Sequence, residues 1–340
     1  MKSLRALFPV FFIAVVTVLS AAESPAGYHL VNTIPLDGDG NQDYLAIDQP
    51  ARRLYVSHFT EVDVIDLDAG KVVGKITGMN GVHGIAFAPE LGRGFITSGN
   101  TATVKIFDLK TFASIADVPT GTGPDGILFE PVTRRVFSFN HRGASLTVID
   151  AVAGQPIANI DLGGQPEFPV TDGKGMVWDI IEDKSTLIKM DAKTLEIVGR
   201  WPLAPGEGPS GMAFDQSSRR LFVGSNNKVL VVVDADSGKI VADLPIGVHI
   251  DAEAYDPKSK LIFSANRGSV TISHQDDKDH YSNVGTLTTW PHANTLALDE
   301  VTGKIYLAAS QFKDEPPASA DAKPKSTKLP GTFSVQVYGR

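Results

Sequence analysis

Short runs of β-branched and aromatic residues alternate with polar residues along most of the chain, and turn-forming residues separate the runs. The pattern is clearest in residues 123–164, where the apolar runs lie at 127–129, 135–139, 145–149 and 156–162. Alternation with a period of two residues is typical of β-strands with one buried face. The Gly, Pro, Asn and Asp residues between the runs are typical of tight turns. The segment therefore predicts four antiparallel strands, called a to d in chain order.

This four-strand unit recurs along the chain. An aspartate closes strand c in each of five units, and a histidine takes its place in a sixth. These residues are Asp66, Asp108, Asp150, Asp191, Asp234 and His274, with steps of 40 to 43 residues between them. Such a period is typical of a propeller blade. With the start of a seventh unit near Pro291, the sequence predicts an all-β fold: a seven-bladed β-propeller with four antiparallel strands in each blade.

The two ends of the propeller sequence complement each other. Residues 28–36 belong to no complete unit, and residues 332–338 look like a strand c with no strand d after it. We therefore expect the N-terminal strand to join the C-terminal blade and close the ring. Residues 313–330, within that blade, are rich in Pro, Ala and Lys without apolar periodicity. They predict a solvated, mobile loop.

The first residues of the chain have the pattern of a secretory signal peptide. Two basic residues precede an apolar run at 6–19, and small residues follow at 20–22. This pattern is typical of a cleaved leader, and the apolar run is short for a membrane span. We therefore expect residues 1–22 to be a signal peptide and 23–340 to form a single propeller domain. The expected location is periplasmic or secreted, with no membrane span after cleavage.

Charge and cysteine content narrow the classes of function. The whole chain has a net charge of −8, and removal of Lys2 and Arg5 with the leader makes the mature chain more acidic. This acidic balance argues against nucleic-acid binding, because such binding depends on cationic contacts to phosphates. The chain has no cysteine, so disulfides and thiolate metal sites are excluded. We expect a monomer.

The repeat resembles the YVTN repeat of YncE-like seven-bladed propellers. The resemblance lies in Pro-Asp-Gly-Ile at 124–127, Leu-Tyr-Val-Ser at 54–57 and the strand c and turn at 231–241. It covers essentially the whole mature chain and implies the propeller fold. It does not imply one function, since propellers of this kind serve as binding scaffolds, nucleic-acid binders, lactonases and subunits of periplasmic redox systems.

One face of the predicted ring collects ionisable and amide side chains. The loops from strand d to the next strand a, and from strand b to strand c, emerge on the same face of a propeller. The ligand-binding candidates on this face are Asp43, His58, His83, Asp125, Asn140, Glu167, Glu182, Asp251, Asn266 and His292. Aspartates at strand starts also have a structural explanation, because they satisfy backbone donors in turns.

A subset of these residues suggests a metal site. Asp251 and Glu253 alternate in one strand, which predicts that both point to the same side. Carboxylates alone favour Ca²⁺, whereas imidazoles favour a transition metal. The candidate ligands of a divalent cation are His83, Glu167, Asp251, Glu253 and His292.

Two functional hypotheses follow. The first is an exported, nonenzymatic scaffold whose polar channel mouth binds a small molecule, an ion or a periplasmic protein. The alternative is a metal-dependent lactonase similar to gluconolactonases, in which the cation polarises a carbonyl and activates water. Lactonase propellers place Glu, Asn and Asp around a central ion, and Glu167, Asn140, Asp251 and Asn266 are the corresponding candidates. The sequence contains no nucleophile-elbow, zincin or haem-attachment motif, so no catalytic residue is assigned.

Overall fold

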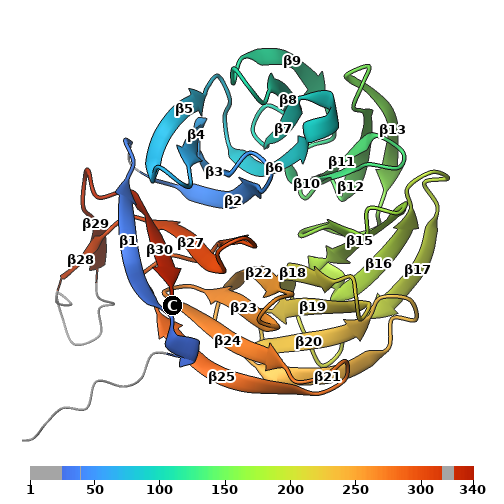
Figure 1. Ribbon diagram of the computed structural model, residues 1–340. Helices are drawn as coiled ribbons and strands as arrows, with labels where there is room; N and C mark the ends of the chain where they lie inside the picture. Colours follow the sequence, from blue (N-terminus) through green and yellow to red (C-terminus); the bar gives the residue numbers. More distant parts are fainter. Residues whose placement is uncertain (1–24, 39, 316–324) are drawn as a thin grey trace, which may run out of the picture.

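The computed structural model describes residues 25–38, 40–315 and 325–340 of the 340-residue chain. Seven four-stranded antiparallel sheets are arranged in a ring around a central axis (Figure 1). This arrangement confirms the predicted seven-bladed β-propeller with four antiparallel strands in each blade. The predicted signal peptide at 1–22 lies outside the described residues.

The strands follow each other from the channel outward in each blade. Blade 1 contains β2 (Gln42–Asp48), β3 (Arg53–His58), β4 (Glu61–Asp66) and β5 (Lys71–Ile76). Blade 2 contains β6 (Val82–Ala88), β7 (Arg93–Ser98), β8 (Thr103–Asp108) and β9 (Ser114–Pro119). Blade 3 contains β10 (Pro124–Glu130), β11 (Arg135–Asn140), β12 (Ser145–Asp150) and β13 (Gln155–Asp161). Blade 4 contains β14 (Val170–Thr171), β15 (Met176–Ile181), β16 (Thr186–Asp191) and β17 (Ile197–Pro202).

The remaining blades complete the ring. Blade 5 contains β18 (Pro209–Asp215), β19 (Arg220–Ser225), β20 (Val229–Asp234) and β21 (Ile240–Pro245). Blade 6 contains β22 (Ile250–Asp256), β23 (Leu261–Asn266), β24 (Ser269–Gln275) and β25 (Tyr281–Thr288). Blade 7 contains β26 (Ala297–Asp299), β27 (Lys304–Ala309), β30 (Ser334–Gly339) and β1 (His29–Pro35). The described residues also form short 3₁₀ helices at η1 (Pro25–Gly27), η2 (Pro89–Leu91) and η3 (Glu182–Lys184).

Burial within a blade follows the position of the strand. In blade 3, the middle strands β11 and β12 are almost entirely buried, whereas the outer strand β13 is largely exposed. The middle strands have neighbouring sheets against both faces, which explains why their small polar residues, such as Ser138 and Thr147, are buried along with the apolar ones. The core is thus divided into apolar clusters that lie mainly between adjacent blades. Each blade depends on its neighbours to bury its faces.

The ring closes as the sequence predicts. Strand β1 pairs with β30, from His29 opposite Gly339 to Pro35 opposite Ser334. Figure 1 shows the two strands side by side, although they come from opposite ends of the chain. The hydroxyl of Tyr28 also donates a hydrogen bond of 2.6 Å to the carbonyl oxygen of Gly303. Blade 7 is therefore built from both ends of the propeller sequence.

The segment predicted to be a mobile loop contains regular structure where it is described. Strand β28 (Phe312–Glu315) pairs with β29 (Lys325–Lys328) to form a two-stranded sheet. The prediction overlooked this hairpin because its strands are short and lack an apolar face. Figure 1 shows the hairpin beside blade 7. Residues 316–324 lie outside the described residues.

Arginines at the first position of the second strand join neighbouring blades. Arg93 donates hydrogen bonds to the carbonyl oxygens of Ala151 and Val152, at 2.8 and 2.7 Å. The guanidinium of Arg135 bonds Ala192 and Lys193 in the next blade in the same way. Because charged donors make stronger hydrogen bonds than neutral ones, these contacts help to fix each blade against the next.

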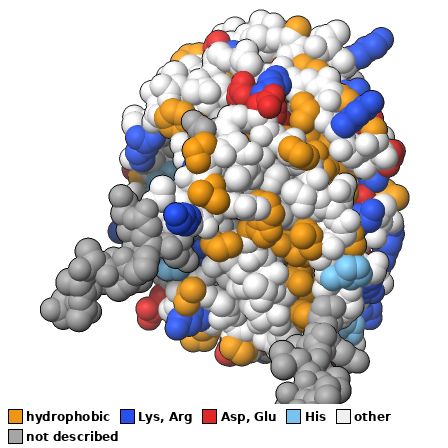
Figure 2. Space-filling view, turned by 90° about the vertical axis from the view of Figure 1, so that its left-hand side faces the viewer, with side chains coloured by type: hydrophobic (Ala, Val, Ile, Leu, Met, Phe, Trp, Pro, Cys, Tyr) orange, Lys and Arg blue, Asp and Glu red, His pale blue; other side chains and the backbone are white. Residues whose placement is uncertain are grey.

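The outer surface is mixed in character. Figure 2 views the molecule from the side on which β1, β28 and β29 lie, and it shows apolar side chains exposed among polar surface and basic residues. Leu30 and Val31 of the outer strand β1 are among the exposed apolar residues. Within the described residues, no helix is long and apolar enough to cross a membrane.

Candidate functional site

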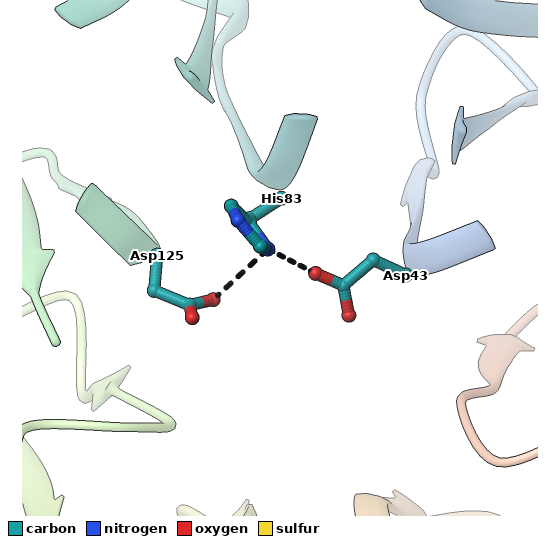
Figure 3. Close-up of side chains that lie close together, drawn as sticks. All are labelled: Asp43, His83 and Asp125. Carbon is teal, nitrogen blue, oxygen red and sulfur yellow. Dashed lines mark hydrogen bonds and ion pairs between the residues drawn. The ribbon is translucent and has the colours of Figure 1, made fainter. Parts of the chain in front are cut away.

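A β-bulge near the start of the innermost strands turns side chains toward the channel. The pairing between the first two strands shifts register between Gln42 and Leu45 in blade 1 and between Pro124 and Ile127 in blade 3. A bulge leaves an extra residue outside the ladder and can redirect its side chain. Figure 3 shows Asp43, His83 and Asp125 pointing toward one another in the channel.

Close packing of the inner strands brings these side chains together. A Cβ atom on Gly84 would lie 2.7 Å from the carbonyl oxygen of Asp125, and one on Gly126 would lie 2.3 Å from that of Glu167. Both distances are too short for any larger residue. Gly84 and Gly126, which directly follow His83 and Asp125, therefore let the inner strand of the next blade approach closely.

Each blade contributes one residue to the mouth at an equivalent position. The seven residues are Asp43, His83, Asp125, Glu167, Ser210, Asp251 and Asn294. His292, the mouth candidate predicted from blade 7, lies two residues before this position. Ala297 pairs with Tyr306 as Ala46 pairs with Tyr55, which makes Asn294 the counterpart of Asp43. Strand β26 has only three residues, so its sequence gave little indication of register.

The first group of candidate ligands comes from blades 1 to 3. The Nδ1 atom of His83 forms a short contact with a carboxylate oxygen of Asp43 and lies 3.8 Å from Oδ1 of Asp125. The three candidate ligand atoms lie within 4.8 Å of one another. Two carboxylates and one imidazole could therefore bind the same ion.

A second group shares Asp125 with the first. The Nδ1 atom of His141 lies 2.8 Å from Oε2 of Glu167, and these atoms lie within 4.8 Å of Asp125. The other ring nitrogen of His141 is 3.9 Å from Oε2 of Glu182. Asp125 thus occupies the centre of a five-residue set, called here the mouth cluster: Asp43, His83, Asp125, His141 and Glu167.

The mouth cluster retains protons in the absence of a cation. Burial, followed by the charges of Asp43 and Glu167, raises the pKa of Asp125 to about 8. Burial opposes protonation of His83, but its hydrogen bond to Asp43 and the charge of Asp125 raise its pKa to about 9. The hydrogen bond to Glu167 raises the pKa of His141 to about 9. These shifts follow from close negative charges in a poorly solvated site.

Two further residues surround the mouth cluster. Burial and the charges of Asp43 and Glu167 raise the pKa of Asp251 well above its ordinary value, and Asn294 donates a hydrogen bond to this carboxylate. Tyr44 stacks on Phe168 with 5.5 Å between ring centroids. Because these rings come from blades 1 and 4, the aromatic pair spans the channel.

Three predicted candidates lie elsewhere and make structural hydrogen bonds. Asn140 and Asn266 are buried and donate to the hydroxyls of Thr147 and Thr271, at 3.0 and 2.9 Å. Glu253 is buried beside Gly224 of the neighbouring blade and accepts a 2.9 Å hydrogen bond from Ser264.

Glu253 and Asp251 separate despite their alternation in sequence. The register shifts between Ile250 and Ala252, so the two side chains do not point to the same place. The five predicted metal ligands therefore do not meet at one point. His83 and Glu167 belong to the mouth cluster, Asp251 and His292 lie beside it on blades 6 and 7, and Glu253 lies between blades 5 and 6.

His58 belongs to a separate ion-pair network. Its Nε2 atom lies 2.9 Å from Asp63 and 3.3 Å from Glu61. This set has the spacing of metal ligands, but the ammonium group of Lys75 lies 2.9 Å from Glu61 and 3.3 Å from Asp63. Lys75 already supplies a cation to these carboxylates, so the set is explained as a salt-bridge network.

Sequence reasoning overlooked several residues of the site. His141 lies in a loop between strands b and c on the predicted mouth face, but it was not chosen as a ligand. Tyr44 and Asn294 were not among the candidates, and neither was Asp179. The last is fully buried, and its pKa is raised well above the ordinary value by burial and by the charge of Glu167. One signal was available for Asn294: counting back from Tyr306 by the 12 residues that separate Tyr55 from Asp43 identifies it.

A cavity of about 570 Å³ opens beside the mouth cluster. Its wall comes from blades 5, 6, 7 and 1 and includes Asp251 and Asn294. The mouth therefore has two halves: carboxylates and imidazoles on blades 1 to 4, and amides, hydroxyls and basic groups on the cavity side. Asp251 lies between them, since it lines the cavity and interacts electrostatically with the mouth cluster.

Comparisons with known proteins support the architecture. No protein-family model matches the chain, and no curated protein matches it. The chain is similar to a solved structure of hydrazine synthase from Kuenenia stuttgartiensis, with 14% identity, a TM-score of 0.71 and coverage of 86% of this chain and 97% of that one. It also resembles the WD40 repeats of RRP9 and the structure of U3-55K. Each is 9% identical and covers 93% of this chain and 99% of its own, with TM-scores of 0.76 and 0.74. At these identities the likeness supports the seven-bladed propeller fold alone.

Proposed function

We propose that this protein is an exported, YncE-like propeller that binds a divalent transition-metal ion at its channel mouth. The observation that carries the proposal is the meeting of two carboxylate-and-imidazole groups at Asp125. Like charges at this separation are costly in a poorly solvated site. A divalent cation would compensate them and displace the protons that the cluster otherwise retains. The N-terminal sequence and the repeat motif support export and the YncE-like assignment.

The ligand chemistry favours a transition metal over Ca²⁺. Each three-residue group contains one imidazole, His83 or His141. Calcium prefers an all-oxygen set of six to eight ligands, whereas imidazole suits Mn, Fe, Co, Ni, Cu or Zn.

Metal binding should be visible as a gain in thermal stability. The protein is prepared with chelator, dialysed, and melted with and without excess Mn²⁺ or Zn²⁺. At an ion concentration of 100 times the dissociation constant, linkage gives about 2.7 kcal/mol, or a rise in Tm of about 5 °C for a domain of this size. Elemental analysis of the loaded protein should show bound metal.

A matched pair of variants locates the ion. Asp125→Asn should lose the metal and its thermal shift, because the central ligand oxygen loses its charge. Asp243→Asn makes the same change on the exposed outer strand β21 and should behave like the wild type. Equal metal content and equal shifts in both variants, or no shift in the wild type, would contradict the proposal.

Lactone hydrolysis at the same site stays a prediction. In this reaction water adds to the acyl carbon, the ring C–O bond breaks, and a hydroxy acid forms. Glu167→Gln should reduce turnover of a lactone panel by about 100-fold or more if the ion activates the water. Metal-loaded wild-type protein that leaves every lactone intact would argue against this activity while leaving metal binding unaffected.

A further inference from the structure

The cavity beside the mouth cluster has a lining of mixed chemistry. Its amide and hydroxyl residues are Asn41, Gln42, Ser210, Asn226, Asn294 and Ser310. Such groups donate and accept hydrogen bonds in several directions, which suits a ligand with many hydroxyl groups. Its volume of about 570 Å³ lies within the range of small-molecule sites.

A basic group lies on the same wall and is held in place. The guanidinium of Arg267 donates to Nδ1 of His292, with 2.8 Å between Nε and Nδ1. The ring of His292 packs on Phe312 with 4.1 Å between centroids. Among the described residues, no carboxylate lies within salt-bridge distance of Arg267. Nδ1 of His292 accepts from Arg267 and brings no carboxylate to it, so the positive charge of the arginine can attract an anion that enters the cavity.

The balance of charge indicates how acidic the ligand is. Arg267 and Lys328 are basic groups of the cavity, and Asp251 is acidic. The mouth cluster adds further carboxylates on the far side of Asp251. A dianion such as a phosphate ester would be repelled by these charges more strongly than a monoanion. A single carboxylate is therefore the better match.

We propose that the cavity binds a sugar acid, that is, a small polyhydroxylated carboxylic acid. Its carboxylate pairs with Arg267, and its hydroxyl groups bond the amide and hydroxyl wall. One ligand oxygen reaches past Asp251 to the metal ion, and this last contact rests on the metal binding proposed above. Arginine suits this role because its planar group can bond both oxygens of a carboxylate.

Calorimetric titration of metal-loaded protein with D-gluconate tests the proposal. Two control compounds separate its parts: sorbitol has the hydroxyl groups without the carboxylate, and propionate has the carboxylate without the hydroxyl groups. Gluconate should bind at least about tenfold more tightly than either, because each control lacks one set of hydrogen bonds. Equal or absent binding of all three compounds would overturn the proposal, as would tighter binding of glucose 6-phosphate than of gluconate.

Two variants distinguish the ligand from the ion. Arg267→Gln should weaken gluconate binding by about tenfold or more while the metal content stays unchanged. Asp125→Asn should lose the metal and, with it, part of the gluconate affinity. Gluconate affinity unaltered by Arg267→Gln would overturn the ligand proposal. Metal content is measured on the same samples. Metal-loaded protein that does not bind gluconate would refute the ligand proposal alone, whereas wild-type protein that takes up no metal would refute the metal proposal.

Discussion

Deletion of strand β1 is expected to abolish cooperative folding of the ring. The deletion of residues 25–36 removes the outer strand of blade 7 and the buried side chains of Tyr28, Ile34 and Leu36. Each such side chain contributes about 1.5–3 kcal/mol by burial. Their sum is comparable to the whole stability of a typical domain, about 5–15 kcal/mol. Strand β30 would also become an exposed edge, which favours aggregation.

A circular permutant is the matched control. The start of β1 lies opposite the end of β30, at His29 and Gly339, and Gly27 lies near Arg340. A short glycine-rich linker after Arg340 could therefore return residues 27–36 as the last strand of a hairpin. We expect the permutant to recover a cooperative denaturant transition that the deletion lacks. A deletion that unfolds like the full chain would contradict the role of β1 in closing the ring.

The fold could be predicted because the sequence repeats its local signals in register. The apolar strands, the turn residues and the aspartate after strand c recur together, and each copy is incomplete without neighbours. Ring closure was predictable for the same reason, since residues 28–36 match the outer strands elsewhere, including the proline near the end. Such prolines are compatible with an outer edge, as Pro119 and Pro202 show at the ends of β9 and β17.

The mouth was predictable in position but not in detail. Asp43, His83, Asp125 and Glu167 were identified from the blade register, and the structure brings them together. His141 lies in the loop between β11 and β12, on the face where such loops were predicted to emerge, but the repeat does not determine that its side chain turns toward Asp125 and Glu167. Blade 7 departs from the repeat, so register there could be obtained only by counting back from Tyr306.

Asp251 and Glu253 show a different limit of sequence reasoning. Strand alternation predicts a shared direction, but the bulge after Ile250 redirects one of the two. A bulge depends on how two strands pair, and that pairing leaves no mark on the apolar pattern of either strand alone. The β-bulges that turn side chains toward the channel mouth therefore also break the period-two alternation that strand sequences predict.

The metal-free protein is expected to lose stability as pH rises. The folded state raises the pKa of Asp125 to about 8 and those of His83 and His141 to about 9. For Asp125 the folded state retains a proton above the ordinary carboxyl range, so its contribution falls as pH rises from about 4 to about 8. The two histidines contribute fully below about pH 6.5 and lose their contribution as pH rises through about 9. All three shifts therefore act in the same direction.

Denaturant unfolding in chelator measures this pH dependence. Between about pH 5 and about pH 9, we expect the free energy of unfolding to fall by on the order of 3 kcal/mol, after allowance for the mutual coupling of these groups. Added metal should flatten the profile because it binds the deprotonated cluster, and its affinity should rise with pH. A flat profile in chelator would contradict the retention of protons.

Asp125→Asn should separate stability from metal binding. The amide has nearly the same shape as the carboxyl group but adds no negative charge to the mouth cluster. At about pH 8 in chelator we therefore expect the variant to be more stable than the wild type, by on the order of 1–2 kcal/mol, and its pH profile to be shallower. In excess metal the order should reverse, because only the wild type gains binding energy. A variant less stable than the wild type in chelator would show that Asp125 is needed for folding rather than for holding a cation. A variant that is more stable in chelator but less stable in excess metal would show that the carboxylate of Asp125 destabilises the metal-free fold and that metal binding compensates for this.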